Sequence, residues 1–305
     1  MDKTYLFNNY ISIARKFLSE KNNIKALKFL KMAYNCDEGK EDIELILDLA
    51  LLYDKVGNKA LSKKMYEKVI EIDKNEARAY YGIAVLYDDM EEYDDAIKYY
   101  IKAIELNENY DKAYFFLANC YDEIGEQEKA IENYKEVLRI EPRDLWANAN
   151  LGCIYDEIGE IGLAIEYMSK ALEINSKHFR ILFNMGVFMA KIGENDKAKE
   201  FYKKSIDENP YFPYSYLNYS VIYRENQDYD KAIEIINEGI KENPDEGFLY
   251  YNRACFYVNI DEIEKAFDDI QTAISLNQIF DEYMKKDSEL DPIRSLERYM
   301  ELYGE

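Results

Sequence analysis

A period of 34 residues constrains the fold of this chain more than any other feature of its sequence. In residues 77–110, Tyr80 and Tyr87 mark the apolar stripe of one expected helix, and Ala96 and Ala103 mark that of a second. Two amphipathic helices of this length cannot bury both apolar faces against each other. The unit therefore needs similar units on either side, and the sequence predicts an array of helix pairs.

Three columns of residues recur at this interval and indicate how the helices pack. A small residue opens the second helix of each unit: Ala26, Ser62, Ala96, Ala130, Ala164, Ala198, Ala232 and Ala266. A large residue lies late in the first helix: Phe17, Tyr53, Tyr87, Tyr121, Tyr155, Met189, Tyr223 and Tyr257. A third column, early in the first helix, stays small: Ala14, Ala50, Ala84, Ala118, Gly152, Gly186, Ser220 and Ala254. Small residues allow helices to approach closely, while large ones fill the space beside them.

The phase of these columns sets the expected boundaries. We expect residues 1–6 to lead into the array, residues 281–305 to form a C-terminal cap, and eight repeats to lie between them, at 7–40, 43–76, 77–110, 111–144, 145–178, 179–212, 213–246 and 247–280. Glycines that suit a positive φ lie in the turn inside the unit: Gly57, Gly125, Gly159 and Gly193. Prolines that stop the second helix lie just past it: Pro142, Pro210 and Pro244.

The period of 34, the Leu-Gly/Ala-x-x-Tyr of the first helix, the Ala-x-x-x-Tyr-x-x-Ala of the second and the trailing proline resemble tetratricopeptide repeats. The resemblance covers residues 7–280 and implies an all-α fold, a right-handed α-solenoid (superhelix) of helix pairs, here helix A and helix B. It also implies a non-enzymatic scaffold or adaptor in which helix A lines a concave groove. Some residues depart from the pattern and put local packing in doubt: Ser62, Met189, Gly239 and Arg253.

The repeat pattern breaks after residue 280. Asp291 and Pro292 suit the N-cap and the first position of a helix. The following apolar residues would line one face of a single final helix: Ile293, Leu296, Met300 and Tyr303. We expect this helix to be a C-terminal capping helix that covers the last repeat.

The charge of the chain excludes several classes of partner. With 39 Lys and Arg against 61 Asp and Glu, the net charge of −22 repels phosphate backbones and anionic membranes. We therefore expect neither nucleic acid nor a membrane among its partners, and no apolar run reaches the roughly 20 residues that span a bilayer. The 4 cysteines form no CxxC pair, which favours reduced thiols in a cytoplasmic protein.

Groups that support catalysis or metal binding do not assemble in the sequence. His178 is the only histidine, and it lacks partners at the spacing of a metal site or a general base. Three glycines in residues 152–162 follow no predicted strand, so they do not indicate a phosphate loop. We expect no catalytic residue, no metal and no cofactor, and hence no enzyme.

Positions 2, 6, 9 and 13 of each repeat share one stripe of helix A, the helix A stripe, which lines the concave surface in tetratricopeptide proteins. In the last four repeats, position 6 holds an asparagine ladder: Asn150, Asn184, Asn218 and Asn252. An amide offers both a donor and an acceptor, so the ladder can pair with the backbone of an extended peptide. Position 2 there holds residue types that are common at interface hot spots or anchors: Trp146, Arg180, Tyr214 and Phe248. Asparagine is also common at position 6 in the family, so family background is the alternative explanation.

Acidic residues end helix A in repeats two to five: Asp54, Asp88, Asp89, Asp122, Glu123, Asp156 and Glu157. Such a run can simply be a solvated face. If it forms an acidic groove wall, it favours a peptide or protein partner with a basic segment.

The expected function is thus a scaffold or adaptor that binds an extended peptide or partner protein in its groove, as a monomer rather than a homo-oligomer. Two alternatives remain open: a self-assembling structural protein, and a regulatory module of a peptide-responsive signalling system. Several co-chaperones of the resembled family grip a C-terminal carboxylate with paired basic residues and asparagines. That set is missing here, because Gly82 accompanies Arg78 and Phe116 accompanies Lys112. We therefore expect no strong binding of acidic C-terminal tails.

Overall fold

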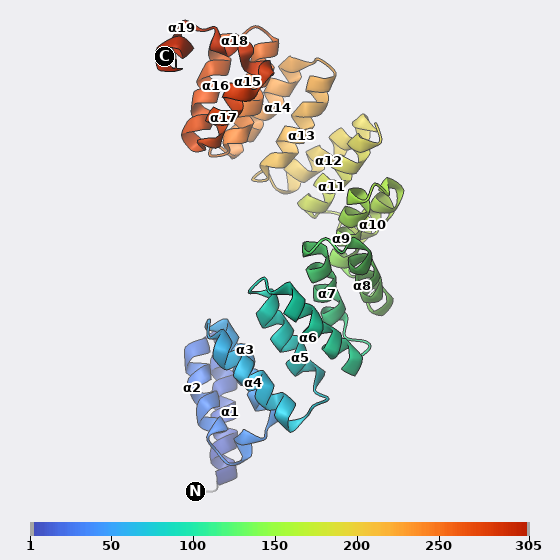
Figure 1. The fold of residues 1–305 in the computed structure, drawn as a ribbon, viewed down its shortest axis with the longest axis vertical. Coiled ribbons are helices and arrows are strands. Elements are labelled where there is room, and N and C mark those ends of the chain that lie inside the picture. The colour runs from blue at the N-terminus through green and yellow to red at the C-terminus, as the bar shows by residue number, and fades with distance from the viewer. Residues whose placement is uncertain (1–2, 304–305) are drawn as a thin grey trace. The chain divides into compact units, whose positions relative to one another are not determined.

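The computed structural model describes residues 3–303, which fold into helices without a strand. The chain divides into two compact units, Met1–Ala147 and Asn148–Glu305. Residues 1–2 of the expected lead-in and residues 304–305 of the expected cap lie outside the described part. Within each unit the helices form pairs that follow one another in chain order (Figure 1).

The N-terminal unit begins with α1 at Lys3, inside the expected lead-in. Its elements are α1 (Lys3–Ser19), α2 (Asn23–Tyr34), the 3₁₀ turn η1 (Glu38–Lys40), α3 (Ile43–Lys55), α4 (Lys59–Ile72), α5 (Ala77–Asp88), α6 (Tyr93–Leu106), α7 (Asp111–Glu123) and α8 (Gln127–Ile140). The two helices of each pair pack along each other, and the second helix of one pair packs on the first helix of the next, as α4 does on α5.

Helix α9 (Leu145–Glu157) spans the boundary between the units. The C-terminal unit continues with α10 (Ile161–Ile174), α11 (Phe179–Lys191), α12 (Asn195–Glu208), α13 (Pro213–Glu225), α14 (Tyr229–Glu242), α15 (Gly247–Asn259), α16 (Ile263–Leu276), α17 (Ile279–Lys286), η2 (Ser288–Leu290), α18 (Asp291–Arg294) and α19 (Glu297–Tyr303). Of the helices in residues 3–303, none is both long enough and apolar enough to cross a membrane.

The two small columns lie where helices A and B touch, as the sequence predicts. Every residue of the column that opens helix B is fully buried, and the early helix A column is buried as well. At Gly152, an added Cβ would lie 3.0 Å from Cε of Met168 and 3.2 Å from the carbonyl oxygen of Ala164. A larger residue in either column would therefore force the two helices apart.

The turn between helices A and B has a left-handed backbone at one position of the period. The predicted glycines Gly57, Gly125, Gly159 and Gly193 have φ between 76° and 82°. Other residues take the same position elsewhere, with φ between 54° and 62°: Lys21, Glu91, Gln227 and Asp261. The geometry of the turn is thus kept even where the side chain does not favour it.

Residues that depart from the repeat pattern are accommodated by local contacts. The hydroxyl of Ser62 donates to the carbonyl oxygen of Ala50 at 2.8 Å. Gly239 leaves room for Tyr216, whose Cβ would lie 2.8 Å from a Cβ added at Gly239. Met189 is buried, as Tyr53 and Tyr155 are at the same position of other repeats. These departures therefore leave the packing intact.

Arg253 stands where the pattern expects a leucine, and it forms an ion pair with Asp269 of α16. Its Nε and Nη2 atoms donate to the carboxylate of Asp269 at 2.7 and 2.6 Å. Both side chains are mostly buried, with 18% and 9% of their surface exposed. The ion pair links α15 to α16 inside the last helix pair.

The expectation of one capping helix that starts at its N-cap Asp291 is wrong. Asp291 is already the first residue of α18, which ends at Arg294, and the chain bends at Ser295 before α19. The bend lets residues from both short helices pack on the core of the last repeat, whereas Met300 stays 58% exposed. The residues that reach this core are Leu290, Ile293, Leu296, Tyr299 and Tyr303.

Candidate functional site

The asparagine ladder lies half-buried along the A helices of the C-terminal unit. The Nδ2 atom of Asn184 donates to Sγ of Cys153 at 3.4 Å. The Nδ2 atom of Asn252 donates to the carbonyl oxygen of Phe248, one turn earlier in α15, at 2.8 Å. Asn218 shares a hydrogen bond with the hydroxyl of Tyr202. The fold thus uses part of the bonding capacity of each of these three amides, and each amide has further capacity for an external backbone.

Aromatic rings lie beside the ladder in the same unit. The rings of Tyr214 and Phe248, from consecutive A helices, stack at 5.2 Å, and Tyr214 is 50% exposed. Phe212 packs against Tyr214 at 5.4 Å and against Phe183 at 5.2 Å. We call Phe212, Tyr214 and Phe248 the aromatic ledge. A rigid, partly exposed aromatic surface of this kind loses little conformational entropy when a partner covers it.

Two further position 2 residues carry exposed side chains. Arg180 is exposed, and its guanidinium lies 5.7 Å from the ring of Phe179. Trp146 belongs to the N-terminal unit and is 46% exposed. Arg180 therefore lies in the same unit as the ladder and the aromatic ledge, whereas Trp146 does not.

The chain itself covers the C-terminal half of the helix A stripe in the last repeat, Cys255 and Asn259, which the sequence did not predict. The turn η2 and the residue before it, together the C-terminal anchor, lie against α15. Glu289 accepts hydrogen bonds from Arg224 and from Nδ2 of Asn259, each at 2.8 Å. The hydroxyl of Tyr251 donates to Asp287 at 2.6 Å. The stripe is therefore open only on the N-terminal side of this anchor.

The anchor brings Cys255 close to Asp287 and Glu289, with their potential ligand atoms within 4.8 Å of one another. The two carboxylates already accept hydrogen bonds from Tyr251 and Arg224. Burial raises the pKa of the Cys255 thiol to about 12, so the sulfur is protonated near neutral pH. The cluster therefore fits a hydrogen-bonded anchor better than a metal site.

The acidic residues at the ends of the early A helices come together in the N-terminal unit. Burial raises the pKa of Asp88, and the hydroxyl of Tyr100 donates to this carboxylate at 3.0 Å. The charges of Asp89 and Glu123 act on Asp88 in the same direction as burial. Burial also raises the pKa of Asp54, and Asp89 of the next repeat adds to the effect. These carboxylates are therefore close enough to act as one acidic surface.

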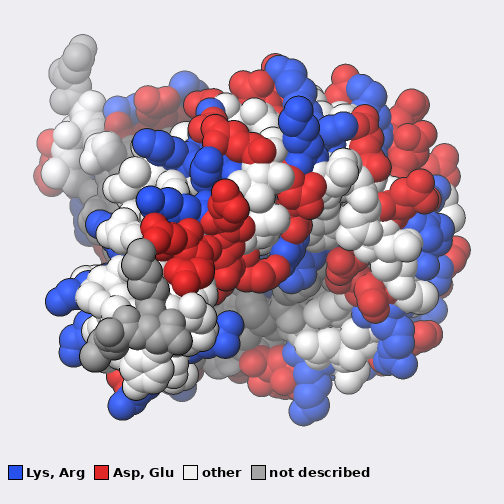
Figure 2. Space-filling view, turned by 90° about the horizontal axis from the view of Figure 1, so that it is seen from below, with Lys and Arg blue, Asp and Glu red and all other residues white. Residues whose placement is uncertain are grey.

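Lysines offset part of this acidic wall. Lys59 lies 3.3 Å from Asp89, and Lys191 lies 2.6 Å from Asp156. Acidic and basic side chains are interspersed in Figure 2, with one dense group of acidic ones. Asp122 is half-buried and Glu157 is exposed. The acidic residues at the ends of the A helices thus form a surface that lysines interrupt.

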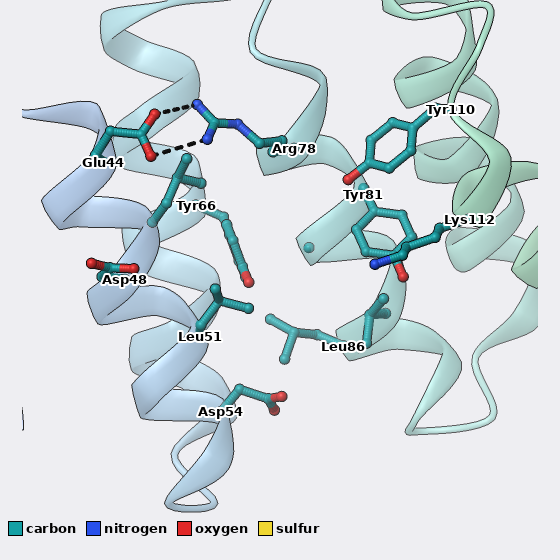
Figure 3. A pocket seen from close by; sticks show the side chains of 13 residues that line it. Glu44, Asp48, Leu51, Asp54, Tyr66, Arg78, Tyr81, Leu86, Tyr110 and Lys112 are labelled. Atoms are coloured by element: carbon teal, nitrogen blue, oxygen red, sulfur yellow. Dashed lines mark hydrogen bonds and ion pairs between the residues drawn. The ribbon is translucent and has the colours of Figure 1, made fainter. Parts of the chain in front are cut away.

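A cavity of about 420 Å³ lies inside the N-terminal unit, between α3, α4 and α5 (Figure 3). Position 6 of α5 is Gly82, where the last four repeats have asparagine. A Cβ added there would lie only 2.2 Å from the ring of Tyr66, so the ring packs directly on the backbone of α5. Tyr81 and Leu51 complete this part of the wall. Sequence analysis missed the cavity, although Gly82 was a visible departure from the ladder.

The cavity has carboxylates inside and an ion pair at its edge. Asp48 and Asp54 line it from α3, and burial raises the pKa of both. Within residues 3–303, neither of them forms an ion pair. Arg78 is held by Glu44 and Glu76, each at 2.7 Å. Its charge is therefore already neutralised. The charge of Arg15 acts on Asp48 and that of Lys59 on Asp54, each against the effect of burial.

The histidine does not resemble a catalytic group. The ring of His178 stacks on Phe179 at 5.5 Å, and burial lowers the pKa of His178. It is therefore neutral near pH 7 and packs as an aromatic side chain.

Consecutive helix pairs with small residues at their crossings define a helical-repeat protein of the α-solenoid class. Family models described as tetratricopeptide repeat match residues 43–76, 75–143, 147–178, 193–252 and 249–280. The chain therefore belongs to the tetratricopeptide repeat family, and the predicted all-α solenoid class is confirmed. Proteins of this family are generally interaction scaffolds that bind peptide or protein partners, and they are typically not enzymes.

Solved structures with the same fold include YrrB, described as a tetratricopeptide protein with an unusual peptide-binding site. It is 26% identical, with a TM-score of 0.53, and the match covers 60% of this chain and 94% of that one. PilF of Pseudomonas aeruginosa is 16% identical over 74% of this chain and 99% of that one, with a TM-score of 0.59. The Cut9–Hcn1 assembly matches at 16% identity and a TM-score of 0.56, over 91% of this chain and 55% of that one. The last two show the fold alone. No curated protein matches the chain.

Proposed function

We propose that this chain is a non-enzymatic scaffold that binds an extended peptide, or an extended segment of a partner protein, along the helix A stripe of its C-terminal unit. The asparagine ladder carries this proposal, because its half-buried amides recur in consecutive repeats beside the partly exposed aromatic ledge. In this arrangement the amides bind the peptide backbone, and the ledge with Arg180 contacts its side chains. The likeness to YrrB supports the proposal, since that protein is described as having a peptide-binding site.

The repeat boundaries, the oligomeric state and the cellular location form part of the same proposal. We assign eight repeats to residues 7–280 and the cap to residues 281–305, with the C-terminal anchor closing one end of the stripe. The protein acts as a monomer in the cytoplasm, in keeping with the buried thiols of Cys120 and Cys255, whose pKa burial raises to about 12. Its partner carries a basic segment, because the acidic wall and the net charge of −22 favour one.

Affinity capture from a lysate of the source cell tests this function. The bait is the full chain, and the test variant is Asn184→Ala/Asn218→Ala. A control is Asn133→Ala in α8, because Asn133 is half-buried like the ladder asparagines but lies on a B helix, where its amide donates to the carbonyl oxygen of Lys129 at 2.8 Å. We expect the wild type and the control to retain a partner that the double variant loses. Equal capture by all three proteins would contradict the proposal.

A further inference from the structure

The cavity of the N-terminal unit has the size and lining of a side-chain pocket. Its volume of about 420 Å³ falls within the range of ligand sites. Leu47, Leu86 and Tyr66 are almost completely buried in its wall, whereas Leu51 is 51% exposed although it lies in the middle of α3. An apolar wall with one half-exposed leucine offers a contact surface for the aliphatic part of a side chain.

The cavity depends on features that the other repeats do not combine. Tyr66 can rest on the backbone of α5 only because Gly82 has no side chain. In Figure 3 the ring of Tyr66 points from α4 into the space between α3 and α5. Any larger residue at position 82 would displace the ring into the cavity. Gly82 therefore gives Tyr66 its place in this pair of repeats.

The charge of the lining favours a cation. Asp48 and Asp54 lie along one side of the cavity, above and below Leu51 (Figure 3). The lining also holds two cations: Arg78, which is held by Glu44 and Glu76, and Lys112, an exposed residue of α7. Although Arg15 acts on Asp48 and Lys59 on Asp54, burial still raises the pKa of both carboxyl groups. An apolar occupant would bury them further without adding a counter-charge, which is costly, whereas a cationic head group would supply one.

We propose that this cavity binds a lysine or arginine side chain of the partner peptide. The aliphatic stem lies along Leu51 and the ring of Tyr66, and the cationic head lies beside the carboxylate of Asp54, with the negative charge of Asp48 about one and a half turns away on the same helix. The inference rests on the proposed function in that the ligand is a peptide, but it concerns a different unit of the chain from the asparagine ladder. It assigns the basic segment of the partner to the N-terminal unit.

Selection from a random 12-residue peptide library displayed on phage tests the pocket. The full chain is the bait, and the affinities of the selected peptides are then measured by calorimetry. We expect the selected peptides to share a lysine or arginine at one position. Replacing that residue by norleucine, which keeps the stem and removes the charge, should weaken binding at least tenfold.

Two variants of the chain sharpen the test. Asp48→Asn/Asp54→Asn should weaken the selected peptides at least tenfold and should abolish the difference between lysine and norleucine. Gly82→Ala, which displaces Tyr66, should have the same effect. The control Asp94→Asn/Asp230→Asn removes the same charge from exposed positions on α6 and α14 and should change affinity less than threefold. Melting curves confirm that each variant is folded, and the conservative Asp→Asn exchange keeps the test valid if Gly82→Ala fails to fold.

The outcomes separate this inference from the proposed function. The assignment of a basic side chain to the pocket would be wrong if the selected peptides shared no basic position. It would also be wrong if they bound the Asp48→Asn/Asp54→Asn variant as tightly as the wild type. If Asn184→Ala/Asn218→Ala weakened those peptides, the proposed function would stand. If the aspartate variant lost binding and the asparagine variant did not, the pocket would stand without the ladder. A selection that enriched no peptide would count against both.

Discussion

Each ladder asparagine has a structural contact as well as a possible binding role. The amide of Asn252 bonds to its own helix, whereas that of Asn184 reaches Cys153 in the preceding repeat. Replacing Asn184 by alanine therefore removes a contact between repeats together with a group that can bind a peptide. Stability and affinity must be measured separately for these residues, because the two losses have different causes.

The left-handed turn position gives a prediction for a single residue. Gln227 is exposed and has a φ of 61°, which is unfavourable for a residue with a Cβ. The Gln227→Gly variant should raise the free energy of unfolding by about 0.5–1 kcal/mol, since the strain that is relieved exceeds the entropy that glycine adds to the unfolded chain. The reverse change, Gly193→Gln, should lower it. Thermal melting decides, and a lower midpoint for Gln227→Gly would refute this account of the turn.

The buried ion pair predicts a strong coupling between two residues. Asp269→Ala leaves the guanidinium of Arg253 buried without its carboxylate and should cost about 3–5 kcal/mol. Arg253→Leu/Asp269→Leu removes both charges and should lie within about 1 kcal/mol of the wild type. Chemical denaturation of the single and double variants provides the measurement. If Arg253→Leu/Asp269→Leu were as unstable as Asp269→Ala, the cost of Asp269→Ala could not be ascribed to the unpaired charge of Arg253.

At the scale of the helices, packing rests on the small columns. Ala164 is fully buried at the start of α10, and its carbonyl oxygen lies close to Gly152 of α9. Ala164→Leu should therefore lower the free energy of unfolding by about 1–3 kcal/mol. The control is Gly162→Ala in the same helix, where an added Cβ meets no atom within 4 Å. The free energy of unfolding of this control should stay the same or rise. An unchanged melting midpoint for Ala164→Leu would mean that this column is not tightly packed.

Sequence analysis located the repeat helices better than the end of the chain. Columns such as the one with Ala164 repeat in every unit, so agreement between units defines the helices. The segment after residue 280 has no such repetition, and the pattern of Ile293, Leu296 and Met300 suggested one helix where the structure has two. The bend at Ser295 depends on contacts with α15 and α16 that local spacing does not show.

At the scale of the whole molecule, the sequence predicted the fold class and part of the candidate site. Repeat proteins are held together by contacts between neighbouring units, so a regular sequence contains most of the information on the fold. The C-terminal anchor could not be predicted, because Arg224 and Glu289 are 65 residues apart and lie outside the periodic relation. The cavity could not be predicted either, since it requires Tyr66 and Gly82 to meet across two repeats.

Because acidic residues are in excess, the binding of a basic partner should depend on the salt concentration. If a basic partner segment binds near Asp54 and Asp88, its association should weaken several-fold as salt rises from about 0.05 to 0.5 M. Hydrogen bonds from the asparagine ladder act at short range, so their contribution should not depend on salt. The two parts of the site can therefore be told apart by ionic strength.

Calorimetric titration of a captured or selected peptide at both salt concentrations tests the central claim most directly. We expect Asn184→Ala and Asn218→Ala each to weaken binding by about 0.5–1.5 kcal/mol at either salt. Reversing the acidic residues Asp88, Asp89, Asp122 and Glu123 to lysine should remove most of the salt dependence and leave the contribution of the ladder in place. If both sets of variants bound the peptide like the wild type, the helix A stripe would not be the binding surface.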